Sequence, residues 1–186
     1  MKSRLSRNLV ALSGMALLAA ASPALASNPM VGGAAMYSTR NIVENAVNSK
    51  DHTTLVAAVK AAGLVDTLAG AGPFTVFAPT NAAFAKLPAG TVESLVKPEN
   101  KGALTQILTY HVVPGRYTAQ QIASLAAQSG GTATLKTVEG EDLRFAKAPD
   151  GGWSVIDAKG NTARITIANV MQSNGVIHVI DAVAMP

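Results

Sequence analysis

FTVFAPTNAAFAKLP, residues 74–88, places a strand pattern directly before a helix pattern. The stretch begins with aromatic and β-branched residues up to Pro79, which predicts a buried strand. Pro79 can end that strand because it has no backbone donor to leave unpaired. Thr80 or Asn81 can then cap the following helix with a side-chain oxygen, and Phe84 would return to the same core. We therefore expect a strand and a short helix that share one hydrophobic core.

Upstream of this stretch the apolar spacing is helical. Ser38 or Thr39 can cap a helix whose apolar residues continue to Val47 at near-helical intervals. Asp51 is placed to cap a second helix, and Gly63 is a natural C-terminal stop for it. The segment before residue 74 therefore predicts two helices and a further helical turn.

Downstream, the pattern changes from helix to strand. An amphipathic helix is expected over residues 97–110, Val112-Val113 begin a strand, and Thr118 can cap one more helix. After residue 131 we expect five strands, over residues 133–138, 142–148, 153–158, 163–170 and 175–185. Helices with one strand among them, followed by mostly antiparallel strands, indicate an α+β fold.

The first 26 residues have the pattern of a secretory signal peptide. Lys2, Arg4 and Arg7 form a positive start, and the apolar segment over residues 9–21 is too short to span a bilayer comfortably. Residues 24–26, Ala-Leu-Ala, are the small-x-small pattern that precedes cleavage. We expect cleavage after Ala26, export to the periplasm or the medium, a flexible lead-in over residues 27–38 and one domain over residues 39–186.

Charge and cysteine content exclude several classes of function. Without the three basic residues of the signal, 12 basic residues face 11 acidic ones, a net charge of +1. No run of basic residues interleaves with aromatics, so we expect no nucleic-acid partner. The chain has no cysteine, which excludes disulfides, thiolate metal sites, a catalytic thiol and a lipoprotein anchor. No second long apolar segment follows, so no membrane span is expected.

Three segments together resemble the fasciclin (FAS1) domain. They are residues 74–88, the Tyr110-His111 pair with its apolar flanks, and NGVIHVID at residues 174–181. Order and spacing agree over roughly residues 39–184. The resemblance implies a β-wedge of two packed sheets, mostly antiparallel, with a group of helices on one side. It also implies a secreted or surface module associated with adhesion. The motif residues to which we assign a structural role are Phe74, Phe77, Pro79, Thr80, Asn81, Phe84, Asn174, Gly175, His178 and Asp181.

The NGVIHVID segment makes physical sense as a turn followed by a buried strand. Asn174-Gly175 can take the positive-φ turn that other residues resist. His178 would share one face of the strand with Val176 and Ile180. If the strand is buried on both faces, His178 and Asp181 require hydrogen-bond partners.

The Tyr110-His111 pair admits three roles. We expect the two residues to be adjacent on a strand, so that their side chains point to opposite faces and cannot act together on one substrate atom. His111 is then a buried hydrogen-bonding residue, near Thr80 and Asn81. The alternatives are a binding surface and acid–base catalysis. The resemblance implies adhesion at this place, and the candidate binding residues are Tyr110, His111, Ile107, Leu108, Val112 and Val113.

A second adhesion motif of the family would fall on Asn169, Val170 and Met171. Asn169 stands where an aspartate is usual in the family, which weakens the transfer of that role. We expect this segment to be a strand edge that leads into a turn.

The sequence shows no pattern typical of a metal site or of a nucleophilic active site. His52, His111 and His178 are widely separated, and the acidic residues at positions 139–142 lack the spacing of a calcium loop. The sequence contains no G-x-S-x-G elbow. We expect no cofactor.

The combined reading is an exported, non-catalytic recognition or adhesion module. Its partner would be a cell-surface or matrix protein or polysaccharide. Weak contacts per domain suggest multiple copies or weak self-association. The alternative is an extracytoplasmic binder of a small apolar or aromatic ligand, which needs a pocket of a few hundred Å³. A third interpretation, a hydrolase that uses His111 or His178, needs one of these histidines in an open cleft.

Overall fold

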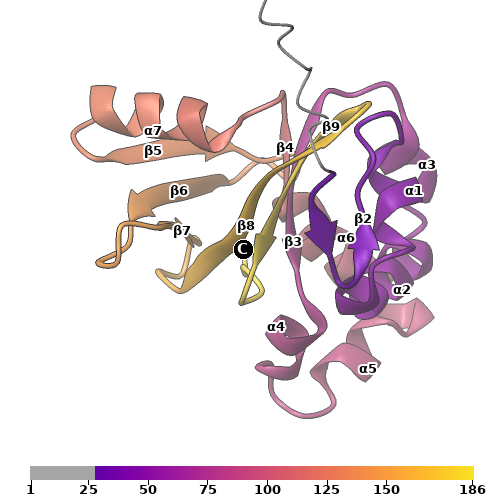
Figure 1. Cartoon of the computed structure of the whole chain (residues 1–186). Helices are drawn as coiled ribbons and strands as arrows, with labels where there is room; N and C mark the ends of the chain where they lie inside the picture. Colours follow the sequence, from indigo (N-terminus) through magenta and orange to yellow (C-terminus); the bar gives the residue numbers. More distant parts are fainter. Residues whose placement is uncertain (1–27) are drawn as a thin grey trace, which may run out of the picture.

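The computed structural model describes residues 28–186 (Figure 1). The expected signal peptide and its cleavage position lie outside the described residues. The helices are α1 (Ile42–Ala46), α2 (Thr53–Ala62), α3 (Val65–Ala69), α4 (Asn81–Ala85), α5 (Thr91–Leu95), α6 (Lys101–Tyr110) and α7 (Ala119–Gln128), with 3₁₀ turns η1 (Lys50–His52) and η2 (Pro98–Asn100). The strands are β1 (Met30–Val31), β2 (Ala34–Ala35), β3 (Phe74–Pro79), β4 (Val112–Pro114), β5 (Thr132–Lys136), β6 (Asp142–Lys147), β7 (Trp153–Ile156), β8 (Thr162–Gln172) and β9 (Gly175–Ile180).

One seven-stranded sheet organises the molecule, in the order β4-β3-β9-β8-β7-β6-β5. Neighbouring strands of this sheet are antiparallel, except that β3 and β9 are parallel. In the β3–β9 pair, Phe77 lies opposite His178. The long strand β8 changes register between Ile165 and Val170, which lets the sheet bend there. The expected α+β fold with a mostly antiparallel sheet is confirmed. We expected two packed sheets. The structure has instead one continuous sheet whose two halves are joined through β8.

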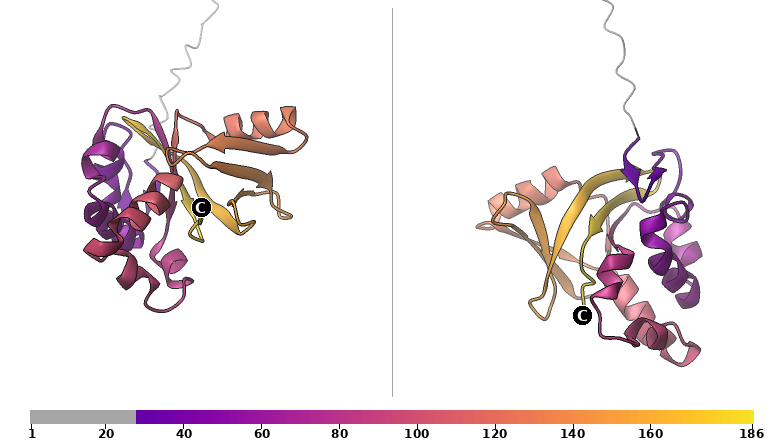
Figure 2. Two further views of the ribbon diagram at one scale, coloured as in Figure 1. Left: turned by 180° about the vertical axis from the view of Figure 1, so that it is seen from behind. Right: turned by 60° about the horizontal axis from the view of Figure 1, so that its bottom comes forward.

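Two hydrophobic clusters fill the space on the two faces of the central strands. The helices α1, α2, α3 and α6 pack on one half of the sheet, and α7 lies over β5 on the other (Figures 1 and 2). Neighbouring residues of one strand belong to different clusters, as with Val76 and Phe77 or Val112 and Val113. Strands β3 and β9 are therefore buried on both faces, which explains their nearly continuous apolar sequence.

The segment before α1 is structured, which corrects the expected flexible lead-in. Residues 30–35 form the β1–β2 hairpin, and Val31 and Met36 are 4% and 2% exposed. The backbone N–H of Lys50 donates to the carbonyl of Gly32 at 3.1 Å, so the hairpin tip sits on η1. A Cβ atom at Gly32 would lie 2.4 Å from Ser49 Oγ, which leaves room only for glycine.

The N-caps of the first two helices also differ from expectation. Asn41, not Ser38 or Thr39, caps α1, in a capping box with Glu44. Asp51 lies inside η1, and α2 has no side-chain cap of its own. The expected stop at Gly63 is confirmed, with φ of 73°.

Asn81 supplies the missing cap of α2 from a distant part of the chain. Its Oδ1 accepts from the Thr54 N–H at 3.0 Å and from the Thr53 hydroxyl at 3.2 Å, and its Nδ2 donates to the Lys50 carbonyl at 2.8 Å. The helix α4, in which Asn81 is the first residue, is capped by Thr80. The fasciclin-like motif thus connects two helices to the end of β3.

Asn81→Ala is expected to lower the free energy of unfolding by about 1–2 kcal/mol, because the Thr54 N–H in the first turn of α2 loses its acceptor. Urea denaturation monitored by circular dichroism measures this change. Asn48→Ala is the matched control, since Asn48 is exposed and its side chain makes a single bond, to Glu44 O. Equal stability of the two variants would contradict the capping role.

Candidate functional site

Tyr110 ends the helix that the sequence predicted over residues 97–110, and His111 follows it, so the pair does not lie on a strand as we also expected. Tyr110 is the last residue of α6, and His111 is its C-cap with φ of −82° and ψ of −1°. Strand β4 begins at the next residue, Val112. The two side chains nevertheless diverge: Tyr110 packs in the cluster under α7, whereas His111 faces the cluster under α2. They do not form a catalytic pair.

His111 is a neutral, fully bonded residue of the interior. Its Nε2 accepts from the Ala184 N–H at 3.0 Å, so Nδ1 carries the proton and donates to the Ile107 carbonyl at 2.8 Å. The sequence analysis expected His111 near Thr80 and Asn81, but its hydrogen-bond partners are Ile107 and Ala184. Burial lowers the pKa of His111 to about 4, against smaller opposing contributions from the Ile107 carbonyl and from Asp157. The ring connects α6 to the C-terminal segment.

His111→Ala is expected to lower the free energy of unfolding by roughly 1–3 kcal/mol at neutral pH. The variant leaves the buried N–H of Ala184 and the carbonyl of Ile107 without their partners. Thermal unfolding followed by circular dichroism measures the loss. An unchanged melting temperature would refute the structural role.

Tyr110 also has its polar atom occupied inside the fold. Its hydroxyl donates to the Asp142 carbonyl at 3.2 Å and accepts from the Ala158 N–H at 2.8 Å. Burial raises the pKa of the Tyr110 phenol, against a smaller lowering by the bond from Ala158. Tyr110 thus holds the start of β6 and the turn after β7 to the helix α6.

The six candidate binding residues are all buried. Their side chains are between 0% and 8% exposed: Ile107, Leu108, Tyr110, His111, Val112 and Val113. In the folded chain a macromolecular partner does not reach them. Contact at this place would require local opening of the C-terminal end of α6.

Asn174 and Gly175 do not form the expected positive-φ turn; they lie where the backbone is tightly packed. Among the described residues the one non-glycine position with positive φ is Asn169, and Gly175 is not among the positive-φ glycines. A Cβ atom on Gly175 would lie 2.1 Å from the Phe74 carbonyl oxygen, because β3 and β9 approach closely there. Asn174 accepts from the Ile42 N–H at 3.0 Å and donates to the carbonyls of Leu68 and Gly70, both at 2.8 Å. It holds α1 and α3 to the start of β9.

His178 and Asp181 have partners of different kinds. The fully buried His178 has Nε2 2.8 Å from the Tyr117 carbonyl, and Nδ1 accepts from the Asn169 N–H at 3.4 Å. Burial lowers the pKa of His178, against a smaller raising by the Tyr117 carbonyl. Asp181 is partly exposed, accepts from the Arg164 N–H at 2.7 Å and pairs with Lys86 at 3.7 Å. Neither residue lines the apolar cavity beside His52.

Residues 169–171 lie inside β8, which corrects the expected strand edge. Asn169 has φ of 59°, at the irregular part of the strand, where an asparagine is better tolerated than most residues. Its Oδ1 accepts from the Ala119 N–H, the first of α7, at 2.7 Å. Val170 is fully buried, and Met171 is partly exposed near the β8–β9 turn.

An apolar cavity lies between the hairpin, the helices and the sheet. Its volume is about 50 Å³, and Met36, Ile42, Leu55, Val59 and His52 are among the residues that line it. Ligand pockets for small organic molecules are roughly 300–1,000 Å³. The cavity is therefore far smaller than the pocket that the alternative of a small apolar ligand requires.

His52 beside this cavity was not singled out by sequence reasoning as a buried group. Its Nδ1 is 2.8 Å from Ser49 Oγ, and its buried Nε2 has no hydrogen-bond partner of acceptable geometry, although the Ala78 backbone is near. Burial lowers the pKa of His52, more than the Ala78 backbone and Asp51 raise it. Its neighbours Asp51 and Thr53 are polar, so no sequence pattern predicted this burial.

Two further observations concern metal ions and membranes. Within residues 28–186, no group of three or more histidine, aspartate or glutamate side chains is arranged to hold a metal ion. None of the helices in the described part is both long and apolar enough to cross a bilayer.

Comparison with known proteins places the chain in a family. The sequence profile of the fasciclin domain matches residues 50–186. The chain belongs to the fasciclin family. It is 55% identical over 157 residues to Protein sll1483 of Synechocystis sp., a match that covers 84% of this chain and 79% of the relative.

One further relative and one solved structure are similar to this chain. The chain is 42% identical over 123 residues to the cell surface glycolipoprotein MPB83 of Mycobacterium bovis, which covers 66% of this chain and 48% of MPB83. Its fold resembles that of a FAS1 domain pair from the insect cell adhesion molecule Fasciclin I, with a TM-score of 0.70 at 19% identity. That match covers 79% of this chain and about half, 51%, of the other.

The residues of the fasciclin motifs therefore stabilise the interior of this domain. Phe77, at the centre of the first motif, lies 5.0 Å from the Phe145 ring and 5.5 Å from the His178 ring. Asn81 caps α2, and Asn174 bonds to α1 and α3. The motif side chains with polar groups hold segments together that are distant in the sequence.

Proposed function

We propose that this fasciclin domain is an exported recognition module that binds a cell-surface or matrix macromolecule without chemical change. The main support is that the polar groups of its family motifs form hydrogen bonds to other parts of the chain. The exterior is then the part that a partner meets. The signal-like residues 1–26 support export. The cell-surface relative and the solved adhesion-molecule structure support a place outside the cytoplasm.

The histidines give little support to a hydrolase. A general acid or base must reach a substrate proton. His111 and His178 are 2% and 0% exposed, and both of their ring nitrogens are within bonding distance of backbone groups. The condition for the hydrolase interpretation, an exposed histidine in a cleft, is not met by either residue.

The test is retention of a partner by immobilised protein. The chain from Ser27 to Pro186, coupled to beads, is exposed to cell-envelope and matrix extracts, beside the same protein unfolded before coupling. We expect saturable retention of protein or polysaccharide by the folded form only, with weak affinity per domain that improves at high bead density. Equal retention by both forms, or none, would overturn the proposal. A small molecule that co-purifies with the protein instead would favour the ligand-binding alternative.

A further inference from the structure

One exposed surface brings together arginine and hydroxyl side chains. It consists of Tyr37, Ser38, Thr39 and Arg40, which precede α1, with Arg116 and Ser173; we call it the arginine–hydroxyl surface. All six residues are exposed. The tip of the β8–β9 turn lies beside the chain that enters α1 (Figures 1 and 2). The segments come together from three distant parts of the sequence.

Ser173 at that turn holds the two arginines near each other. Its N–H donates to the Arg40 carbonyl at 2.9 Å. Nη2 of Arg116 donates to the carbonyls of Ser173 at 3.2 Å and Gln172 at 3.3 Å. Since the N and O atoms of one residue are a few ångströms apart, the Arg116 guanidinium lies within about 10 Å of the Arg40 backbone.

Both arginines are oriented yet retain free donors. The Arg40 guanidinium carbon lies 4.8 Å from the centre of the Tyr37 ring, a cation–π contact that steadies the side chain. Arg116 uses Nη2 for its backbone bonds, which leaves other donors of the planar group for a ligand. Neither arginine pairs with a carboxylate among residues 28–186. Glu44, the acidic residue next along the chain, accepts from the Asn41 N–H.

We propose that the arginine–hydroxyl surface binds a carboxylated polysaccharide of the uronic acid type. This inference rests on the proposed recognition function and names its partner class and place. Both oriented guanidinium groups suit carboxylates: Arg40 can bind one in a forked, bidentate way, and Arg116 can add single hydrogen bonds from Nε and Nη1, because its Nη2 is bonded to the backbone. The hydroxyls of Ser38, Thr39 and Ser173 suit a polyhydroxylated chain, and the half-exposed Tyr37 ring, 41% accessible, offers an edge for a sugar ring. A peptide partner would favour an apolar pocket, and none of these six residues lines the apolar cavity; a nucleic acid would favour a longer basic stripe.

The experiment measures binding of sodium polygalacturonate to the chain from Ser27 to Pro186 by isothermal titration, with neutral dextran as the uncharged probe. We expect binding of polygalacturonate that weakens as salt rises, and none of dextran. Arg40→Gln combined with Arg116→Gln should weaken binding about tenfold or more, since two carboxylate contacts are lost. Tyr37→Ala should weaken it several-fold with net charge unchanged.

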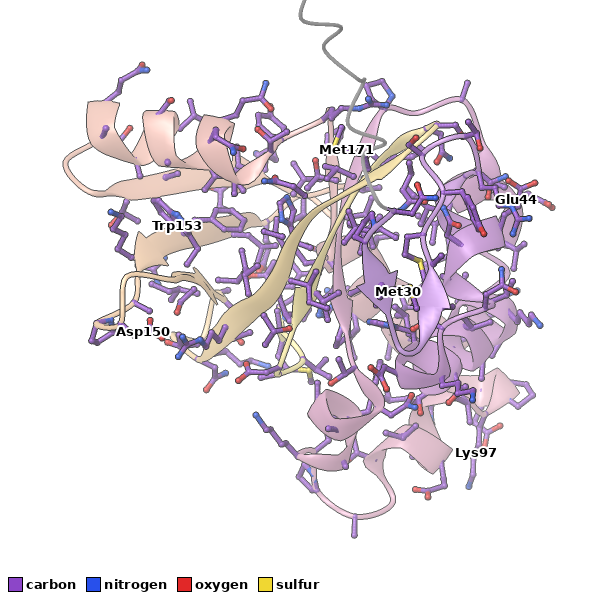
Figure 3. The ribbon with its side chains drawn as sticks, viewed as in Figure 1. Met30, Glu44, Lys97, Asp150, Trp153 and Met171 are labelled. Atoms are coloured by element: carbon purple, nitrogen blue, oxygen red, sulfur yellow. The ribbon has the colours of Figure 1, made fainter. Side chains whose placement is uncertain are left out.

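The control carries the same loss of charge elsewhere. Lys97→Gln combined with Lys147→Gln removes two exposed charges, and Lys97 lies at the other end of the molecule from Met171 beside the turn (Figure 3). This variant should bind polygalacturonate as the original chain does. Equal binding by both double variants, no binding of polygalacturonate, or tighter binding of single-stranded DNA or an acidic protein would overturn the inference. If the extracts still supply a saturable partner, the proposed function survives that failure. Circular dichroism of each variant establishes that it is folded.

Discussion

Phe77→Ala is expected to lower the free energy of unfolding by about 3–5 kcal/mol, the largest loss that we predict for a single substitution. Phe77 is 0% exposed, and its ring lies between those of Phe145 and His178. The strand that carries it is hydrogen-bonded on both sides, so the backbone cannot easily move to fill the space. Removing the ring would therefore leave a cavity as well as remove buried apolar area. Equilibrium unfolding in urea measures the change.

Phe74→Ala is the matched control for this prediction. Phe74 begins the same strand β3 but is partly exposed. Its truncation should cost clearly less than that of Phe77, because fewer contacts are lost and solvent can occupy the space. If the two variants were equally stable, the interior packing around Phe77 would not be the source of stability that the geometry indicates.

Acidification from pH 7 to pH 5 is expected to lower the free energy of unfolding by about 2 kcal/mol through His111 alone. The folded-state pKa of about 4 lies below the ordinary value of 6.5, so the unfolded chain binds the proton first as pH falls. The stabilisation is therefore complete above pH 6.5 and is lost progressively toward pH 4, at up to 1.36 kcal/mol per pH unit. Burial lowers the pKa values of His52 and His178 as well, so their protonation lowers the free energy of unfolding further as the pH falls.

His111→Ala separates this effect from the titration of the other groups. The variant should be less stable than the original chain at pH 7, but it should lose about 2 kcal/mol less between pH 7 and pH 5. Urea unfolding at both pH values gives the two differences. Identical pH dependence in the two proteins would show that the His111 ring does not stay neutral in the folded chain.

The two predictions concern segments that are distant in the sequence but joined in the fold, because Phe77 and His111 are hydrogen-bonded through the backbone. The Phe77 N–H donates to the His111 carbonyl at 2.9 Å. Strand β3 and the end of α6 are thus held together at the boundary between the two hydrophobic clusters.

The sequence by itself determined the elements whose causes lie within a few residues. The aromatic and β-branched run before Pro79 predicted β3, and side-chain caps at Thr80 and Thr118 predicted the starts of α4 and α7. Gly63 predicted the end of α2. These signals work because a cap, a stop or a strand pattern acts on neighbouring backbone groups, whatever the rest of the chain does.

Only the tertiary structure decided which distant groups meet. Asn81 caps a helix that begins 28 residues before it, and the two bonds of the His111 ring run to residues 4 and 73 positions away. The sequence predicted a helix up to Tyr110 but also allowed Tyr110 and His111 to be neighbours on a strand, because apolar residues on both sides of the pair fit either structure. Asn174-Gly175 similarly fitted a turn, whereas close packing against Phe74 and bonds to α1 and α3 require these residues. Such partners depend on strand register and helix packing, which are set by the burial of the whole core and not by local spacing.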